Sequence, residues 1–179
     1  MLKLVSPSEE YKESYIASLL EEDEKNFPRD VVQQVSDNFS AFIKRQSTIQ
    51  TGEFKALDGN SYAIDPQYNY WLINEDGFVG DICLRTKLNP FMEVFGGHVG
   101  YRIRPSLRRK GFGSRMLALL LKIAKDTHGM DRVMIICSPK NIGSKGMIEK
   151  NNGHFEKTNT YIWTEAKMDV YWIDLLEGK

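Results

Sequence analysis

Basic residues and two glycines gather in the stretch RPSLRRKGFGSR, directly before a long apolar run. Gly111 and Gly113 have no Cβ atom, so the backbone can turn tightly and its N–H groups can approach a ligand closely. A helix that begins directly afterwards presents unpaired N–H groups and the positive end of its dipole. The cations around this point are Arg108, Arg109, Lys110 and Arg115. The spacing therefore predicts a phosphate site, and a solvated glycine turn is the structural alternative.

Two common phosphate motifs are absent from this stretch. GFGSRM lacks the third glycine of a dinucleotide fingerprint, and the chain has no G-x-x-x-x-G-K-[ST] run. The sequence thus gives no support to nucleotide hydrolysis.

The signature R-x-x-G-x-G, from Arg108 to Gly113, resembles the acyl-CoA pyrophosphate loop of the GNAT superfamily of N-acetyltransferases. The resemblance covers residues 98–156: IRP, the apolar helix, RVMIIC and NIGSKGMIEKNNGHFE follow in the order of the family's motifs. It implies acetyl-CoA as co-substrate, with the pantetheine arm lying beside Tyr101 to Ile103 and along Asn141 and Ser144. The pyrophosphate would contact Arg108, Arg109, Lys110, Gly111, Phe112, Gly113 and Ser114.

The resemblance also implies an activity, the direct attack of a neutral primary amine on the thioester in a ternary complex. Candidates for the general base are His98 near the start of the strand before the loop, or the carboxylates Glu93 and Asp81. Each candidate also has a purely structural explanation. The histidine would be hydrogen-bonded to a neighbouring strand, and each carboxylate would be a solvated residue on a strand face.

The family's usual general acid is a tyrosine on the helix after Asn141, and Ile148 occupies that position here. Tyr161, Tyr171 or a water replaces it, or the thiolate leaves without a dedicated acid because its pKa is only about 8.5. The departure keeps a second function open, a non-catalytic acyl-CoA-binding or sensing domain. A nucleotide-binding protein that uses the same loop is a third, weaker alternative.

The elements that must position these residues form a mixed α/β fold, an α+β arrangement in the order β-α-α-β-β-β-α-β-α-β-β. We expect a mixed, mostly antiparallel sheet of about seven strands flanked by about four helices. Strands are predicted at 2–5, 68–74, 78–86, 97–104 and 132–137, with two more in 154–176. The apolar strand 132–137 should be covered on both faces.

The helical segments follow from caps and periodicity. Ser6, Pro7 and Glu9 predict a capped helix that runs to about Glu24, and a second helix begins near Asp30. Residues 47–66 are predicted as a loop. A short helix from about Asn141 ends at Gly153 as its C-cap.

Composition narrows the classes of partner. Lys+Arg 24 balance Asp+Glu 24, so no overall field favours nucleic acid. No apolar run or leader indicates a membrane or secretion, which makes a cytoplasmic location the expectation. Residues 1–179 read as a single domain that acts on a small-molecule or peptide amine; a homodimer stays open.

Residue types with metal or redox chemistry are sparse. Cys83 and Cys137 are predicted as core residues. His128 and His154 have no ligand spacing with His98, and no metal is predicted. The three tryptophans are predicted to pack in the core or on a sheet face, and the acidic run EEDEK at 21–25 is either a solvated helix end or an attractor for a cationic amine.

Overall fold

Two antiparallel sheets carry the fold of this computed structural model, which describes residues 1–50, 52–56, 59–160 and 165–176. The strands are β1 (Lys3–Val5), β2 (Glu53–Lys55), β3 (Ser61–Ala63), β4 (Gln67–Asn74), β5 (Gly77–Arg85), β6 (Val99–Ile103), β7 (Arg132–Cys137), β8 (His154–Thr160) and β9 (Lys167–Asp174). The α-helices are α1 (Lys12–Leu20), α2 (Arg29–Asp37), α3 (Phe39–Ser47), α4 (Pro90–Phe95), α5 (Phe112–Asp126) and α6 (Ile142–Glu149). Two short 3₁₀ helices are η1 (Glu9–Tyr11) and η2 (Pro105–Leu107).

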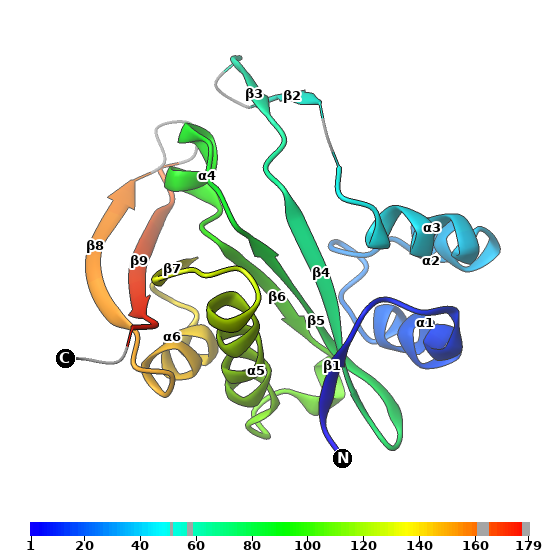
Figure 1. The fold of residues 1–179 in the computed structure, drawn as a ribbon. Helices are drawn as coiled ribbons and strands as arrows, with labels where there is room; N and C mark the ends of the chain where they lie inside the picture. Colours follow the sequence, from blue (N-terminus) through cyan, green and yellow to red (C-terminus); the bar gives the residue numbers. More distant parts are fainter. Residues whose placement is uncertain (51, 57–58, 161–164, 177–179) are drawn as a thin grey trace.

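The larger sheet has the order β1-β4-β5-β6 and the second has the order β7-β9-β8, while β2 and β3 form a separate hairpin. The two large sheets meet at an isolated bridge between Gly97 and Ile135, and Figure 1 shows α5 and α6 beside the junction. The mixed α/β class and the mostly antiparallel strands are confirmed. The expected single sheet is instead divided into sheets of four and three strands.

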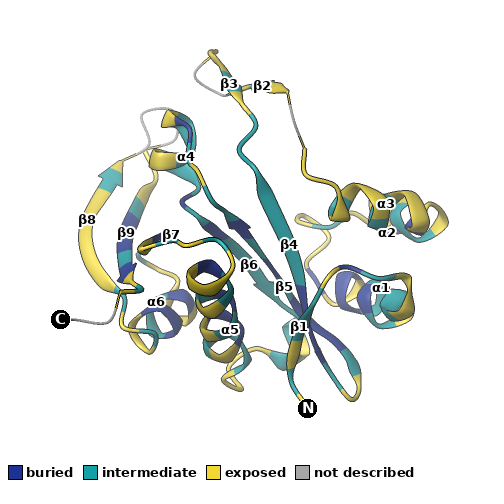
Figure 2. Ribbon diagram, viewed as in Figure 1, coloured by how far each residue is buried: buried dark blue, intermediate teal, exposed yellow. Residues whose placement is uncertain are grey.

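The main core lies between α5 and the strands. The helix buries Met116, Leu117, Leu120 and Ala124, which repeat at intervals of one, three and four residues and so share one face. Figure 2 shows this buried stripe in dark blue and the largely exposed strand β8 in yellow. Strand β7 is buried on both faces, as its uniform apolar sequence predicts.

A second, aromatic core lies where α1, α2 and α3 cover the opposite face of the larger sheet (Figure 1). Tyr15 stacks on Trp71 with ring centroids 4.6 Å apart, and Phe78 meets Tyr15 edge-on at 4.9 Å. Trp71 is thus a core residue, as predicted. Trp172 packs at a sheet face with the Arg132 guanidinium 4.1 Å from its ring centre, and Trp163 lies outside the described residues.

The first helical region differs from the prediction at both ends. Ser8, and not Ser6, provides the cap, because its hydroxyl accepts the Glu10 N–H of η1 at 3.3 Å. Helix α1 ends at Leu20 rather than near Glu24. Just beyond, the Asp23 carboxylate accepts the Lys25 N–H at 2.9 Å, a local bond that competes with helix continuation.

The second helical region and the predicted loop also differ. The chain leaves the helical region at Asn38, which divides the expected helix into α2 and α3. Residues 47–66 contain the β2–β3 hairpin, whose Phe54 and Tyr62 rings each lie 5.7 Å from Phe91 of α4. Helix α4 was not predicted, although Asn89 caps it and Pro90 begins it, a recognisable start signal.

The end of α6 also differs in detail. Asn152, with φ 61°, takes the left-handed conformation that the prediction gave to Gly153. Gly153 is required for a different reason, since a Cβ there would lie 2.2 Å from Ile148 Cγ2. No helix in the described part of the chain is long and apolar enough to cross a membrane.

Candidate coenzyme cleft

A cleft of about 740 Å³ opens where β6 separates from the second sheet. Its wall is formed by β6, the loop after it, the start of α5 and one face of α6. The lining residues are Tyr101, Arg102, Ile103, Leu107, Arg108, Arg109, Gly111, Gly113, Ser114, Asn141, Ile142, Gly143, Ser144, Gly146, Met147 and Lys150. We call this the coenzyme cleft.

Most of the residues singled out from the sequence come together here. The structure places Tyr101, Ile103, Arg108, Arg109, Gly111, Gly113, Ser114, Asn141 and Ser144 on the wall of the coenzyme cleft. Two loop residues do not line it: Lys110 is exposed, and Phe112 packs against the main core.

Sequence reasoning missed one face of α6. Ile142, Gly143, Gly146, Met147 and Lys150 all line the cleft. Gly143, Gly146, Met147 and Lys150 follow one another at intervals of three, one and three residues, so they share one helix face, and helical periodicity would have indicated that face.

The start of α5 has the features of an anion site. Gly111 stands at the N-cap with φ 84° and supplies no side chain to cap the helix. The first N–H groups, from Phe112 to Ser114, therefore lack both an intrahelical acceptor and a capping side chain. Gly111 is needed because few residues other than glycine adopt this left-handed conformation without strain.

The two arginines that precede Gly111 have different positions. Arg108 donates from Nε to the Ile103 carbonyl at 2.9 Å, and its Nη2 forms an ion pair with Glu22. Arg109 has φ 63° and reaches across the cleft, since a Cβ on Gly143 would lie 3.5 Å from its Nη1. Arg109 is thus placed to meet an anion, whereas Arg108 holds the loop.

Strand β6 has one open edge. The His98 N–H donates to the Met134 carbonyl at 2.8 Å beside the Gly97–Ile135 bridge. Beyond this point β6 pairs with β5 alone among the described strands. The backbone groups of the outer edge near Tyr101 therefore face the cleft, as an added strand would require.

Hydroxyl groups lie deeper in the cleft. Ser144 is buried, and both it and Tyr101 line the cleft. Burial raises the pKa of Tyr101 to about 12. Asn141 caps α6 by accepting the Ser144 N–H at 3.0 Å, which confirms its structural role.

The proposed replacements for the missing acid tyrosine lie elsewhere. Ile148 is fully buried in the main core and takes no part in the cleft wall. Tyr171 belongs to β9 and lines a separate pocket behind α6. Tyr161 lies outside the described residues.

His98 has the environment of a structural histidine. Its Nδ1 accepts the Met134 N–H at 2.9 Å. Burial lowers its pKa to about 4, and the nearby Arg132 and Arg85 guanidinium groups act in the same direction. A group with this pKa is a poor acceptor for a proton from an ammonium ion near neutral pH, so this environment does not favour His98 as the base.

The two candidate carboxylates differ in position. Glu93 is exposed on α4 and does not line the cleft, which argues against its catalytic assignment. Asp81 lies on β5 beside β6, with Oδ2 2.7 Å from Arg102 Nη2. Burial raises the pKa of the Asp81 carboxyl, and Arg102 opposes that rise.

The acidic run at 21–25 is engaged within the protein. Glu21 lies 2.6 Å from Arg104 and accepts the Ser106 N–H at 2.9 Å, while Glu24 lies 2.8 Å from Arg29. Glu22 pairs with Arg108. These contacts tie the end of α1 to the coenzyme loop, and they leave little charge for attracting a cationic amine.

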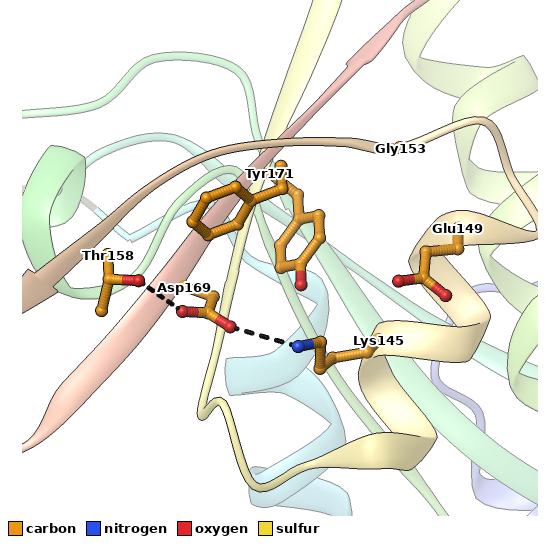
Figure 3. Close-up of a pocket in the computed structure, with 7 residues that line it drawn as sticks. Lys145, Glu149, Gly153, Thr158, Asp169 and Tyr171 are labelled. Atoms are coloured by element: carbon orange, nitrogen blue, oxygen red, sulfur yellow. Dashed lines mark hydrogen bonds and ion pairs between the residues drawn. The ribbon is translucent and has the colours of Figure 1, made fainter.

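A second pocket of about 420 Å³ lies on the other side of α6. Figure 3 shows Lys145 and Glu149 of α6 facing Asp169 and Tyr171 of β9. The Asp169 carboxylate accepts from the Thr158 hydroxyl at 2.8 Å and lies 3.5 Å from Lys145. Thr158, Asp169 and Lys145 therefore already pair with one another.

The cysteines and the possible metal ligands form no further candidate site among the described residues. Cys137 is buried and Cys83 is half-buried, and both are free thiols. Over the described ranges, no group of three histidine, cysteine or carboxylate side chains is placed to hold a metal ion.

Comparison with known families decides the classification. A family model described as an acetyltransferase (GNAT) domain matches residues 3–154. The chain belongs to the GNAT acetyltransferase family. No curated protein gave a significant sequence match.

Solved structures share the fold of this GNAT domain. The microcin C7 self-immunity acetyltransferase MccE, solved with acetyl-CoA and AMP, has a TM-score of 0.67 at 15% identity over 97% of this chain and 92% of its own. Mycobacterium smegmatis RimJ, in complex with CoA-disulfide, has a TM-score of 0.67 at 12% identity over 97% and 81%. A GNAT-family acetyltransferase from Bacillus anthracis has a TM-score of 0.64 at 18% identity over 97% and 95%.

Proposed function

We propose that this protein is an acetyl-CoA-dependent N-acetyltransferase that acetylates a primary amine. The observation that carries the proposal is the coenzyme cleft, in which an uncapped helix start and an open strand edge lie side by side. The coenzymes in the MccE and RimJ structures support the same use of the fold.

Each part of the coenzyme has a matching feature in the cleft. The pyrophosphate binds the N–H groups at the start of α5, with Arg109 adding a full charge. The pantetheine amides pair with the open edge of β6 from Tyr101 to Ile103, and Asn141 and Ser144 form the facing wall. The acetyl group then reaches the point where β6 and β7 diverge.

The acceptor amine approaches from the opposite face of the sheet, because α5, α6 and the coenzyme occupy the first face. Attack of the neutral amine on the thioester carbon forms the amide and releases the coenzyme as a thiolate. Alignment of the two substrates supplies much of the rate. Of the three candidate bases, Asp81 has the position that suits proton acceptance, directly or through a water.

The Tyr101–Ser144 pair stabilises the leaving thiolate by hydrogen bonding. Full proton transfer from Tyr101 is unfavourable, because its pKa of about 12 exceeds the value of about 8.5 for a thiol. The final proton therefore comes from solvent. These features of the cleft favour an enzyme. The alternative, a non-catalytic acyl-CoA-binding or sensing domain, predicts that acetyl-CoA binds without turnover.

The test compares two exposed arginines that are six residues apart. Arg109→Gln removes a charge from the cleft wall, and Arg115→Gln removes the same charge from α5 outside the wall. We expect calorimetry to show about tenfold weaker acetyl-CoA binding for Arg109→Gln, roughly 1.4 kcal/mol, and a smaller change for Arg115→Gln. Equal effects would refute the cleft assignment.

Turnover separates the enzyme from the sensor. The wild-type protein should release free thiol from acetyl-CoA in the presence of an accepted amine. Tight coenzyme binding without thiol release across a broad amine panel would favour the non-catalytic alternative.

A further inference from the structure

Arg85, at the end of β5, is a half-buried cation that pairs with no carboxylate in the described part of the chain. Among the described residues three arginines are half-buried, and the other two have acidic partners: Arg102 with Asp81 at 2.7 Å and Arg104 with Glu21 at 2.6 Å. The Arg85 guanidinium makes one hydrogen bond, from Nη1 to the Gly97 carbonyl at 3.2 Å. A half-buried charge without a counter-ion is costly unless something pairs with it.

The remaining donors of Arg85 are available. Nε and Nη2 have no hydrogen-bond partner in the described part of the chain, and neither nitrogen is sealed from solvent. A guanidinium presents its donors in a planar fork that matches a carboxylate in a two-bond arrangement. The side chain is thus prepared for an anion that the described residues do not supply.

Arg85 lies on the face from which the acceptor must come. Leu84 belongs to the core under α5, so its neighbours in sequence, Cys83 and Arg85, project to the opposite face. Helices α1, α2 and α3 gather at the other end of β4 and β5 (Figure 1). Gln67, directly opposite Arg85 on β4, is also only half-buried.

Arg85 is also close to the reacting point. The Arg85 N–H donates to the His98 carbonyl at 2.7 Å, and Cys83 pairs with Gly100 where β6 begins to leave the second sheet. Two residues along a strand span about 7 Å, so a group bound by Arg85 lies within a small molecule's length of the thioester.

We propose that Arg85 binds a carboxylate of the acceptor, which makes the acceptor an amine that carries a carboxylate within a few bonds, as an amino acid does. This assignment rests on the proposed acetyltransferase function and specifies its substrate class. The pairing of Glu21, Glu22 and Glu24 with arginines agrees with it, because these three carboxylates are not left to select a polycation. A peptide amine far from any carboxylate would leave Arg85 unpaired.

The experiment uses matched pairs of acceptors with the full-length protein. Glycine, β-alanine, 4-aminobutyrate and leucine are each compared with the corresponding primary amide, which keeps the amine and removes the negative charge. Binding is measured by calorimetry in the presence of coenzyme A, and kcat/KM is measured by thiol release from acetyl-CoA. We expect at least one acid to exceed its amide by tenfold or more in affinity and in kcat/KM.

Two variants identify the residue responsible. Arg85→Gln removes the positive charge but keeps an N–H donor for the Gly97 carbonyl. Arg85→Lys keeps the charge but lacks the planar pair of donors that a guanidinium offers. We expect Arg85→Gln to lower the acid-to-amide ratio to about one, mainly through KM, and Arg85→Lys to restore part of it. The amine groups of an acid and its amide have different pKa values. Because this difference is the same for every variant, it cancels when the acid-to-amide ratios of two variants are compared.

The outcomes separate this inference from the proposed function. Failure of coenzyme A to bind would contradict the proposed function itself. Normal coenzyme binding with no acid preference, or with no ligand in either series, would overturn the role of Arg85. A preference that survives in Arg85→Gln would also overturn it, and an equal loss for acids and amides with a lowered melting temperature would show that Arg85 only supports the Gly96–Gly97 turn.

Discussion

Neighbouring residues of one motif have different roles in this protein. Arg108 and Arg109 are indistinguishable by type, yet Arg108 binds the Ile103 carbonyl and Glu22 while Arg109 faces α6 across the cleft. The difference follows from backbone conformation. Arg109 has φ 63°, so its side chain points in a different direction from that of Arg108. A motif therefore locates the coenzyme loop without stating which cation meets the ligand.

At the same scale, His98 gives a pH prediction. Its pKa of about 4 in the folded protein lies below the usual value of about 6.5, so the unfolded chain binds more protons between these values. Stability should therefore fall as pH drops from about 6.5 to 4, by up to roughly 3 kcal/mol from this residue. Urea unfolding of the wild type and His98→Asn at several pH values measures the difference.

The asparagine variant offers an oxygen to the Met134 N–H in place of Nδ1, and it does not titrate. We expect its stability to depend less on pH and its turnover to keep the wild-type pH profile. Loss of turnover, with disappearance of the acid limb of the pH profile, would instead establish His98 as the base.

At the scale of elements, the sequence predicted the parts that local patterns encode. The coenzyme loop, the buried strand β7 and the amphipathic helix α5 all follow from glycine positions, uniform apolarity and helical spacing. The β2–β3 hairpin and α4 were missed, because they are short and Phe54, Tyr62 and Phe91 stabilise them by contacts between distant segments. The surroundings of His98 could not be predicted for a similar reason, since its hydrogen-bond partner Met134 comes from another strand.

Helix α6 allows a prediction in which stability and function change in opposite directions. Gly146 faces the coenzyme cleft, and a Cβ there would meet no atom within 4 Å. Gly146→Ala should raise the melting temperature of the free protein by about 2–4 °C through helix propensity. The same methyl group should weaken acetyl-CoA binding about tenfold, because it occupies space along the pantetheine path. An unchanged dissociation constant would place the pantetheine elsewhere.

Over the whole molecule the acidic and basic residues balance, but their charges are not paired evenly from region to region. Equal numbers of acidic and basic residues give no net field. Carboxylates just after α1 pair with Arg104 and Arg108. Arg109 lines the coenzyme cleft, and Arg85 lies on the opposite face with no carboxylate partner among the described residues. The proposals above assign Arg109 and Arg85 to two anion sites on opposite faces of the larger sheet, one for the coenzyme and one for the acceptor.

The decisive measurement is a crystal structure of the protein with acetyl-CoA. We expect pyrophosphate oxygens on the N–H groups from Phe112 to Ser114, pantetheine amides paired with β6, and the acetyl carbon beside the divergence of β6 and β7. Coenzyme bound elsewhere, for example in the pocket between Lys145 and Asp169, would refute the proposed coenzyme site.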